Sequence, residues 1–188
     1  MYKRQVEYEW GGAFATPGNA YKWVAQAVGG AYADPAMKLV VFDTHAADSE
    51  HLMGLADAAN TLIKGSCPVV NTQGAIAKPT AAGACYTLTF PTTATTDFHA
   101  TVDTTGVANV AFFSEHVPTE FERDTHYFMS TDLLTDIEPG AETNAEEYNC
   151  KLGANSAGLM ECKQAFFIIQ AHHDYCPCLL YTSPSPRD

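Results

Sequence analysis

The sequence predicts a mainly β protein, an antiparallel β-sandwich of six to seven strands with one inserted helix. Three observations indicate this fold. Short apolar segments, most of them alternating with polar residues, recur along the first 130 or so residues. Turn-forming Gly, Pro, Thr and Asp residues separate these segments. One longer segment instead repeats its apolar residues every three or four positions, as a helix does.

The first two predicted strands form a hairpin. Residues 7–14 (EYEWGGAF) and 21–28 (YKWVAQAV) alternate apolar and polar side chains, as half-buried strands do. Pro17 and Gly18 lie between them, and this dipeptide is typical of a tight turn. We therefore expect the two strands to be neighbours in one sheet.

The third predicted strand is residues 37–42 (MKLVVF), which are almost continuously apolar. A strand of this kind is buried on both faces, so we expect it at the centre of a sheet. Further strands are expected at residues 84–90, 97–102 and 107–113, and a short one at residues 67–70.

A helix is predicted after the third strand. Asp48 or Ser49 can supply its N-cap, and Lys64 with Gly65 ends it. The apolar residues between these ends recur at helical spacing: Leu52, Leu55, Ala56, Ala59, Leu62 and Ile63. We expect this helix to cover one sheet or one end of the sandwich.

Composition divides the chain into segments. Residues 1–135 form the predicted β-sandwich, and residues 136–149 are acidic and contain Pro and Gly, which is typical of a linker. Residues 150–177 are interpreted as the truncated start of a helical, Cys/His-containing module. Residues 178–188 (CLLYTSPSPRD) match the translation of a sequencing adapter, with a natural Ser/Pro-rich linker as the alternative. On the adapter interpretation, the natural chain continues beyond Pro177.

The charge narrows the range of partners. The chain has 22 Asp and Glu against 10 Lys and Arg, a formal net charge of −12. Such acidity argues against nucleic acid and anionic membranes as partners. No apolar run approaches the roughly 18 residues of a membrane span, so we expect none in this sequence.

The cysteines predict two locally closed disulfides. Cys67 and Cys85 flank a turn-rich segment, and Cys150 and Cys162 flank a loop of Gly, Asn and Ser. Disulfides form in oxidising compartments, so we expect an extracellular or cell-surface protein. On the adapter interpretation Cys178 is not native, so Cys176 is left over and we expect its partner in the sequence beyond Pro177.

The densest cluster of potential metal ligands lies in residues 115–127 (EHVPTEFERDTHY). If the chain is extended after Pro118, alternate side chains share one face. These side chains, together with the preceding imidazole, are the predicted ligands: His116, Glu120, Glu122, Asp124 and His126. Imidazoles with carboxylates suit zinc or another divalent first-row ion. The alternative is a solvated edge strand whose Phe121 lies in the core.

A second cluster, residues 43–51 (DTHAADSEH), spans the end of a strand and the start of the helix. Helix capping and the helix dipole alone explain carboxylates at this position. His45 and His51 remain of interest because sites are often built on strand-end loops.

A third cluster, QAHHDYC, could form an auxiliary metal site with His172 and His173, each at helical spacing from Cys176. The competing interpretation makes Cys176 half of a disulfide and leaves the two histidines on the surface.

Signals for catalysis are weak. The sequence has no G-x-S-x-G, H-E-x-x-H, Walker or dinucleotide-binding motif. We therefore expect a non-catalytic protein and rank an enzyme third. Trp10, Trp23, Tyr8 and Tyr21 could stack on sugar rings, although aromatic residues at such positions more often belong to the core.

Several phrases resemble a poorly characterised group of predicted secreted proteins from marine phytoplankton: WGGAFATPGNAYKWVAQAVGGAYADPAMKLVVF, AFFSEHVPTEFERDTHY and DIEPGAE. ECKQAFFIIQAHHDYCP resembles Cys/His-containing helical modules of the same kind of protein. The resemblance implies an extracellular setting and a metal association through histidines and acids. We therefore expect an extracytoplasmic protein that binds a divalent metal ion, zinc foremost. The alternative is a structural or adhesive module without metal that contacts cell-surface glycans.

Overall fold

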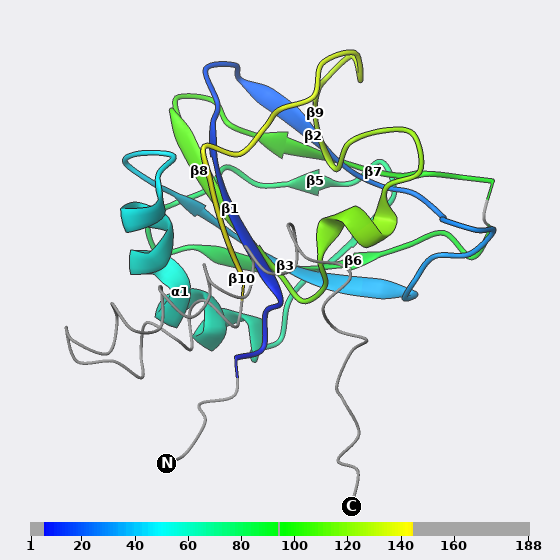
Figure 1. Cartoon of the computed structure of the whole chain (residues 1–188), viewed down its shortest axis with the longest axis horizontal. Coiled ribbons are helices and arrows are strands. Elements are labelled where there is room, and N and C mark those ends of the chain that lie inside the picture. The colour runs from blue at the N-terminus through cyan, green and yellow to red at the C-terminus, as the bar shows by residue number, and fades with distance from the viewer. Residues whose placement is uncertain (1–5, 94, 145–188) are drawn as a thin grey trace, which may run out of the picture. The chain divides into compact units, whose positions relative to one another are not determined.

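The computed structural model describes residues 6–93 and 95–144. These residues form two β-sheets, one α-helix and one short 3-10 helix (Figure 1). The mainly β class predicted from the sequence is thereby confirmed. The chain divides into two units, Met1–Tyr148 and Asn149–Asp188, and every described residue belongs to the first.

The larger sheet has six strands, and one of its two central strands is residues 36–43, where the sequence predicted a central strand. In spatial order the strands are β10 (Ala141–Asn144), β1 (Trp10–Ala15), β8 (Asn109–Ser114), β3 (Ala36–Asp43), β6 (Ala84–Thr89) and β4 (Val69–Asn71). β3 pairs with both β8 and β6. Its predicted central position is confirmed.

The smaller sheet has four strands: β5 (Ala75–Ile76), β7 (Phe98–Asp103), β2 (Ala20–Ala25) and β9 (Phe128–Ser130). The described residues therefore hold ten strands rather than six or seven. Two edge strands are also parallel to their neighbours, β4 to β6 and β5 to β7. The prediction of a purely antiparallel arrangement is wrong for these two pairs. Neither β4 nor β5 pairs with the strand next to it in sequence, so no tight hairpin forces an antiparallel direction.

The predicted hairpin of the first two strands is wrong, because β1 and β2 belong to different sheets. The four residues between them cross from one sheet to the other. The Thr16 amide donates to Ala108 O at 2.8 Å, and the Thr104 amide donates to Asn19 O at 2.9 Å. The crossing lets rings from both strands meet in one core, with the centroids of Trp10 and Trp23 6.4 Å apart.

β3 shows how both faces of the larger sheet are buried. Leu39 and Val41 belong to the main core, which also contains side chains of the smaller sheet, while Val40 and Phe42 contribute to a second core beneath the helix. Successive strand side chains point to opposite faces. A strand buried on both faces therefore reads as a continuous apolar run, and this explains MKLVVF.

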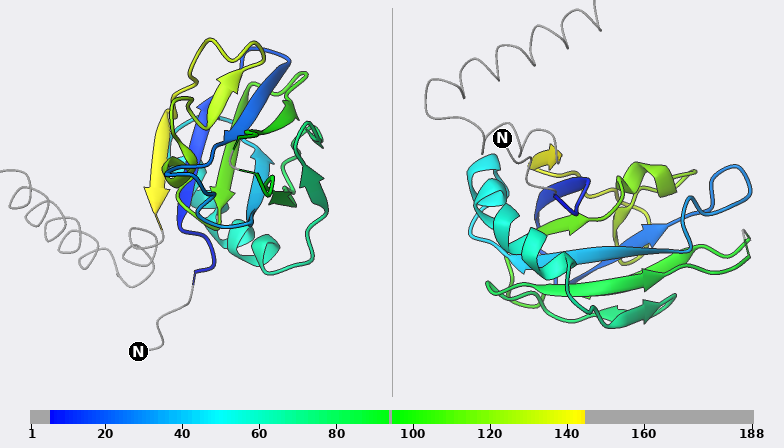
Figure 2. Two further views of the ribbon diagram at one scale, coloured as in Figure 1. Left: turned by 90° about the vertical axis from the view of Figure 1, so that its right-hand side faces the viewer. Right: turned by 90° about the horizontal axis from the view of Figure 1, so that it is seen from below.

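Helix α1 (Ser49–Ile63) covers the outer face of the larger sheet (Figures 1 and 2). Asp48 is the N-cap, and its Oδ1 accepts a hydrogen bond from the His51 amide at 2.9 Å. Its buried residues include Leu52, Ala56 and Ile63, which the apolar spacing predicted. Both the helix and its cap are confirmed.

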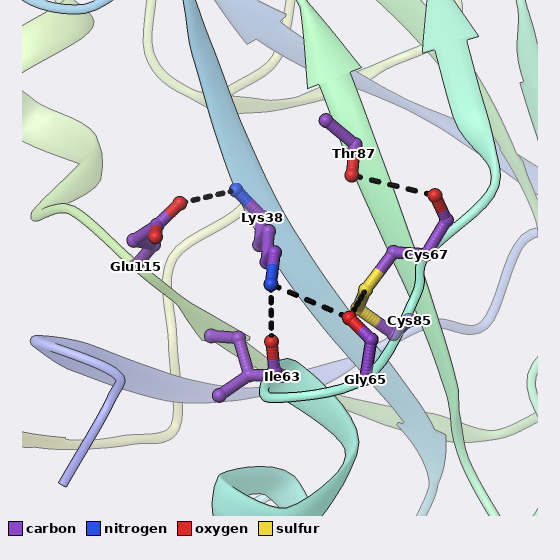
Figure 3. Close-up of a disulfide and its surroundings, with 7 residues drawn as sticks. All are labelled: Lys38, Ile63, Gly65, Cys67, Cys85, Thr87 and Glu115. Atoms are coloured by element: carbon purple, nitrogen blue, oxygen red, sulfur yellow. Dashed lines mark hydrogen bonds between the residues drawn. A yellow bond between two sulfur atoms is a disulfide. The ribbon is translucent and has the colours of Figure 1, made fainter.

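The end of α1 is fastened to the sheet at a corner shown in Figure 3. Cys67, just before β4, forms a disulfide with Cys85 in β6, as predicted. The Lys38 ammonium donates to Ile63 O at 2.7 Å and to Gly65 O at 3.4 Å. A cation at a helix C-terminus satisfies carbonyls that lack partners within the helix. This stapled corner joins α1, β3, β4 and β6.

The predicted linker needs correction at its start. Ala141–Asn144, which the sequence placed in residues 136–149, form β10 and pair with β1. The Gly140 amide also donates to Ala13 O at 2.8 Å. The β-rich unit therefore extends beyond residue 135, because acidic residues can occupy the solvated positions of an edge strand. The predictions for residues 150–177 and 178–188 lie outside the described residues.

Candidate functional site

The segment after β8 carries the predicted metal ligands, and its shape differs from the prediction. Pro118–Phe121 form the 3-10 helix η1, with Pro118 at its start, so the chain is not extended there. The alternation that placed four side chains on one face is therefore wrong. Phe121 is buried, as the alternative interpretation expected. The tight turn instead brings Glu120 back towards His116.

His116 lies among three carboxylates. Its Nε2 is 3.4 Å from Asp34 Oδ2, and its Nδ1 is 3.9 Å from Glu9 Oε2 and 4.0 Å from Glu120 Oε2. The imidazole is 25% exposed, and the carboxylates are 46–55% exposed. We call these four residues the His116 cluster. It brings together one strong metal-ligand type and three anionic groups at the surface.

Two hydrogen bonds to backbone carbonyl groups position Glu9 and His116 of the His116 cluster. The Ser114 hydroxyl donates to His116 O at 2.7 Å, and Ser114 is fully buried. Ser114 O in turn accepts the Glu9 amide at 2.9 Å. These two contacts fix the backbone of Glu9 and His116 near each other at the end of β8, while the side chains of Glu9 and Glu120 are about half exposed.

His126 and Glu122 form a separate pair. Nδ1 of His126 is 2.6 Å from Glu122 Oε1, and the same oxygen accepts the Tyr127 amide at 2.9 Å. Nε2 of His126 is buried and has no hydrogen-bond partner. Because solvent does not reach that nitrogen, an ion could bind there only after the segment opens. The pair fastens the loop that follows η1.

Asp124 belongs to a third group, built around Gln26. The buried Gln26 Oε1 accepts the amides of Arg123, Asp124 and Thr125 at 3.0–3.1 Å. Its Nε2 donates to Asp124 at 2.6 Å and to Asp97 at 2.8 Å. The hydrogen bond from Gln26, and next that from Arg123, lower the pKa of Asp124. This group shapes the loop.

The contacts therefore divide the five predicted ligands into three groups. His116 and Glu120 share one, Glu122 and His126 another, and Asp124 lies in the third. Across residues 6–93 and 95–144, no three His, Cys, Asp or Glu side chains are already arranged to hold a metal ion. His172 and His173, the auxiliary ligands, lie outside the described residues, as do Cys150 and Cys162.

A pocket of about 450 Å³ lies at the second predicted cluster, where β3 ends and α1 begins. Its lining residues are Asp43, Thr44, His45, Glu50, His51, Gly54, Leu55 and Ala81. The ring centroids of His45 and His51 are 6.3 Å apart. The pocket thus combines two imidazoles with two carboxylates.

The aromatic residues of the first two strands are core residues. Trp10, Trp23, Tyr8 and Tyr21 are each no more than 6% exposed. Their interpretation as core is confirmed, and stacking of these four rings on glycans is excluded in this structure.

Sequence reasoning missed Glu9, Asp34 and Gln26. Glu9 and Asp34 approach His116 from segments far away along the chain, so no local spacing connects them to it. Gln26 is a polar residue at an otherwise apolar strand end, and that position was the only signal of its role in the sequence.

A comparison of the chain with protein-family models, curated proteins and solved structures finds no match in any of the three. Among the described residues, no helix has the length and apolar character needed to cross a membrane.

Proposed function

We propose that this chain is a non-catalytic, extracytoplasmic protein that binds a divalent metal ion, zinc foremost, through the His116 cluster. Nδ1 of His116, Glu9 and Glu120 are the ligands. The supporting observation is that two carboxylates, Glu9 from a distant part of the chain and Glu120 from the adjoining η1, approach one imidazole nitrogen at 3.9 and 4.0 Å. Imidazole and carboxylate together suit a borderline ion such as Zn²⁺.

Each glutamate oxygen lies close to the distance from Nδ1 that a shared ion requires. Ligand atoms on one tetrahedral zinc ion are roughly 3.3 Å apart, given bonds of about 2.0–2.2 Å. The separations of 3.9 and 4.0 Å in the structure exceed that value by roughly 0.6–0.7 Å. Both glutamate side chains are about half exposed, so rotation of their side chains can close the gaps. Water completes the coordination shell.

Asp34 has a different role in this proposal. Its carboxylate lies 3.4 Å from Nε2, the nitrogen on the other side of the imidazole. A carboxylate that accepts the second N–H of a ligating histidine fixes the tautomer and orients the ring. Asp34 thus directs Nδ1 towards Glu9 and Glu120. Glu122, Asp124 and His126 enter the proposal as residues that hold the loop after η1.

The extracytoplasmic setting is supported by the Cys67–Cys85 disulfide. Disulfides persist in oxidising compartments and are rare in reducing ones. The net charge of −12 adds a general attraction for cations around the whole molecule.

Isothermal titration calorimetry with zinc on the untagged protein tests the proposal. We expect His116→Ala to remove one bound equivalent, and Asp34→Asn to weaken that site by about 10–100-fold. His99→Gln removes an imidazole in the smaller sheet and should leave zinc binding at the His116 cluster unchanged. Affinity should fall sharply below about pH 6, since protons compete for imidazole. The same zinc binding in wild type and His116→Ala refutes the assignment.

A structural or adhesive module without metal is the second candidate. It is favoured by the observation that no three-ligand group is preformed among the residues described. On that account the exposed acids of the His116 cluster keep this edge solvated. This candidate function predicts that no heat of zinc binding depends on His116. The same comparison of wild type with His116→Ala therefore distinguishes the two functions. With the four aromatics buried, glycan contact on this account would have to use other surface groups.

A further inference from the structure

We propose that the pocket between β3 and α1 is a second metal site, in which His45 and His51 bind a divalent first-row ion and prefer Cu²⁺ to Zn²⁺. The site shares no residue with the His116 cluster and does not depend on it. We call it the His45–His51 pocket. The copper preference follows from the imidazole ligands and the general order of divalent-ion affinities.

The two rings are spaced for a shared ion. Two imidazoles that bind one ion through bonds of about 2.0–2.1 Å have ring centroids roughly 5–6 Å apart. The observed separation is 6.3 Å, with an angle of 68° between the ring planes. His45 is exposed and can move inward by the small remaining distance.

Asp48 orients His51 towards a ligand. Its Oδ1 accepts the His51 amide at 2.9 Å and lies 2.8 Å from His51 Nδ1. A proton on Nδ1 therefore points at the carboxylate, which leaves Nε2 with the lone pair that a metal needs.

The loop that carries His45 is also fixed. The Thr44 amide donates to Asn109 O at 3.1 Å, and the Asn109 side-chain amide donates to His45 O at 3.0 Å. Both contacts tie the loop to β8, next to β3 in the sheet. The backbone of His45 is therefore held in place, and only its exposed side chain has to change conformation for the two imidazoles to bind one ion.

The electrostatics favour a cation despite the nearby helix N-terminus. The N-terminal end of a helix carries an effective charge of about +0.5, which opposes cation binding. Asp43 and Glu50 line the pocket and Asp48 borders it, so three carboxylates outweigh that partial charge. The volume of about 450 Å³ leaves room for the waters that complete the coordination shell of an ion with two histidine ligands.

Copper titration of the full-length, untagged protein tests this site, followed by calorimetry and by electron paramagnetic resonance. Wild type should show nitrogen coordination, and His45→Asn/His51→Asn should lose one bound equivalent of Cu²⁺. His116→Ala is the matched control and should keep that equivalent. The proposal is overturned if the double variant binds as many equivalents, with the same nitrogen signal, as wild type.

Asp48→Asn separates the orienting role of Asp48 from its role as a cap. Asn is as good an N-cap as Asp, so the helix should keep its stability by circular dichroism. Affinity for Cu²⁺ in the His45–His51 pocket should still fall by about tenfold, because the carboxylate that orients His51 is lost. Unchanged affinity in this variant would show that Asp48 only caps the helix.

Discussion

Removal of the Cys67–Cys85 disulfide is expected to destabilise the described unit by about 3 kcal/mol. The two cysteines are 18 residues apart in the sequence. The chain-entropy relation for a loop of that length gives about 10.7 cal/mol/K, or about 3 kcal/mol at 25 °C. The bridge also fastens β4 to β6 at the stapled corner, where the Thr87 amide donates to Pro68 O at 2.8 Å. Its loss should therefore loosen this sheet edge first.

Urea unfolding of Cys67→Ala/Cys85→Ala measures the effect. With an m-value of about 1.5 kcal/mol/M, the midpoint should fall by roughly 2 M. Reduction of the wild type by dithiothreitol should reproduce this loss, and the same treatment of the double variant isolates any contribution from other cysteines. Cys176→Ala is the control that leaves this bridge intact. A midpoint that moves by less than about 0.3 M in the double variant would refute the reasoning.

Three further predictions concern single residues. Gly83→Ala should lower the free energy of unfolding by about 3 kcal/mol, because Gly83 has φ +74° and an added Cβ would lie 2.2 Å from Phe42 Cε1. Thermal unfolding measures this loss, and a melting temperature like that of wild type contradicts it. Gln26→Leu should also lower the free energy of unfolding by about 3 kcal/mol, since three backbone amides lose their acceptor. The amides of residues 123–125 should exchange hydrogen faster in this variant, and unchanged exchange rates contradict the prediction. Burial lowers the pKa of His99, so the unfolded chain takes up a proton as pH falls below about 6.5. Stability should therefore decrease from pH 7.5 to 5.5, and less so in His99→Gln; equal slopes in the two proteins contradict the argument.

The fold class and the central elements could be predicted because their patterns are local. The helical spacing of apolar residues in α1 and its Asp48 cap lie within one short segment. The almost continuously apolar residues 37–42 predicted that β3 is buried on both faces. The prediction that β1 and β2 form a hairpin was wrong for a physical reason. A Pro-Gly turn is compatible with a crossing between sheets, and the pairing of β1 with β8 and β10 depends on distant residues. Strands as short as β5 carry too little pattern to detect.

The candidate site could be predicted only in part. His116 and Glu120 are close in sequence, and the structure keeps them close. The prediction of an extended segment after Pro118 was wrong because Pro118 begins a 3-10 helix, and the alternation of side chains is lost within that turn. Glu9 and Asp34 could not be found from spacing, since only the assembled sheets bring them to the imidazole. Charge patterns identify candidate ligands, whereas tertiary structure selects among them.

The most direct test of the central proposal is a zinc anomalous difference map from crystals of the zinc-loaded protein. We expect a peak about 2.0–2.1 Å from Nδ1 of His116, with oxygens of Glu9 and Glu120 in its coordination shell. Asp34 should lie on the opposite side of the ring, within hydrogen-bonding distance of Nε2. A map with no peak at His116, or with zinc bound to Nε2 instead, would contradict the account.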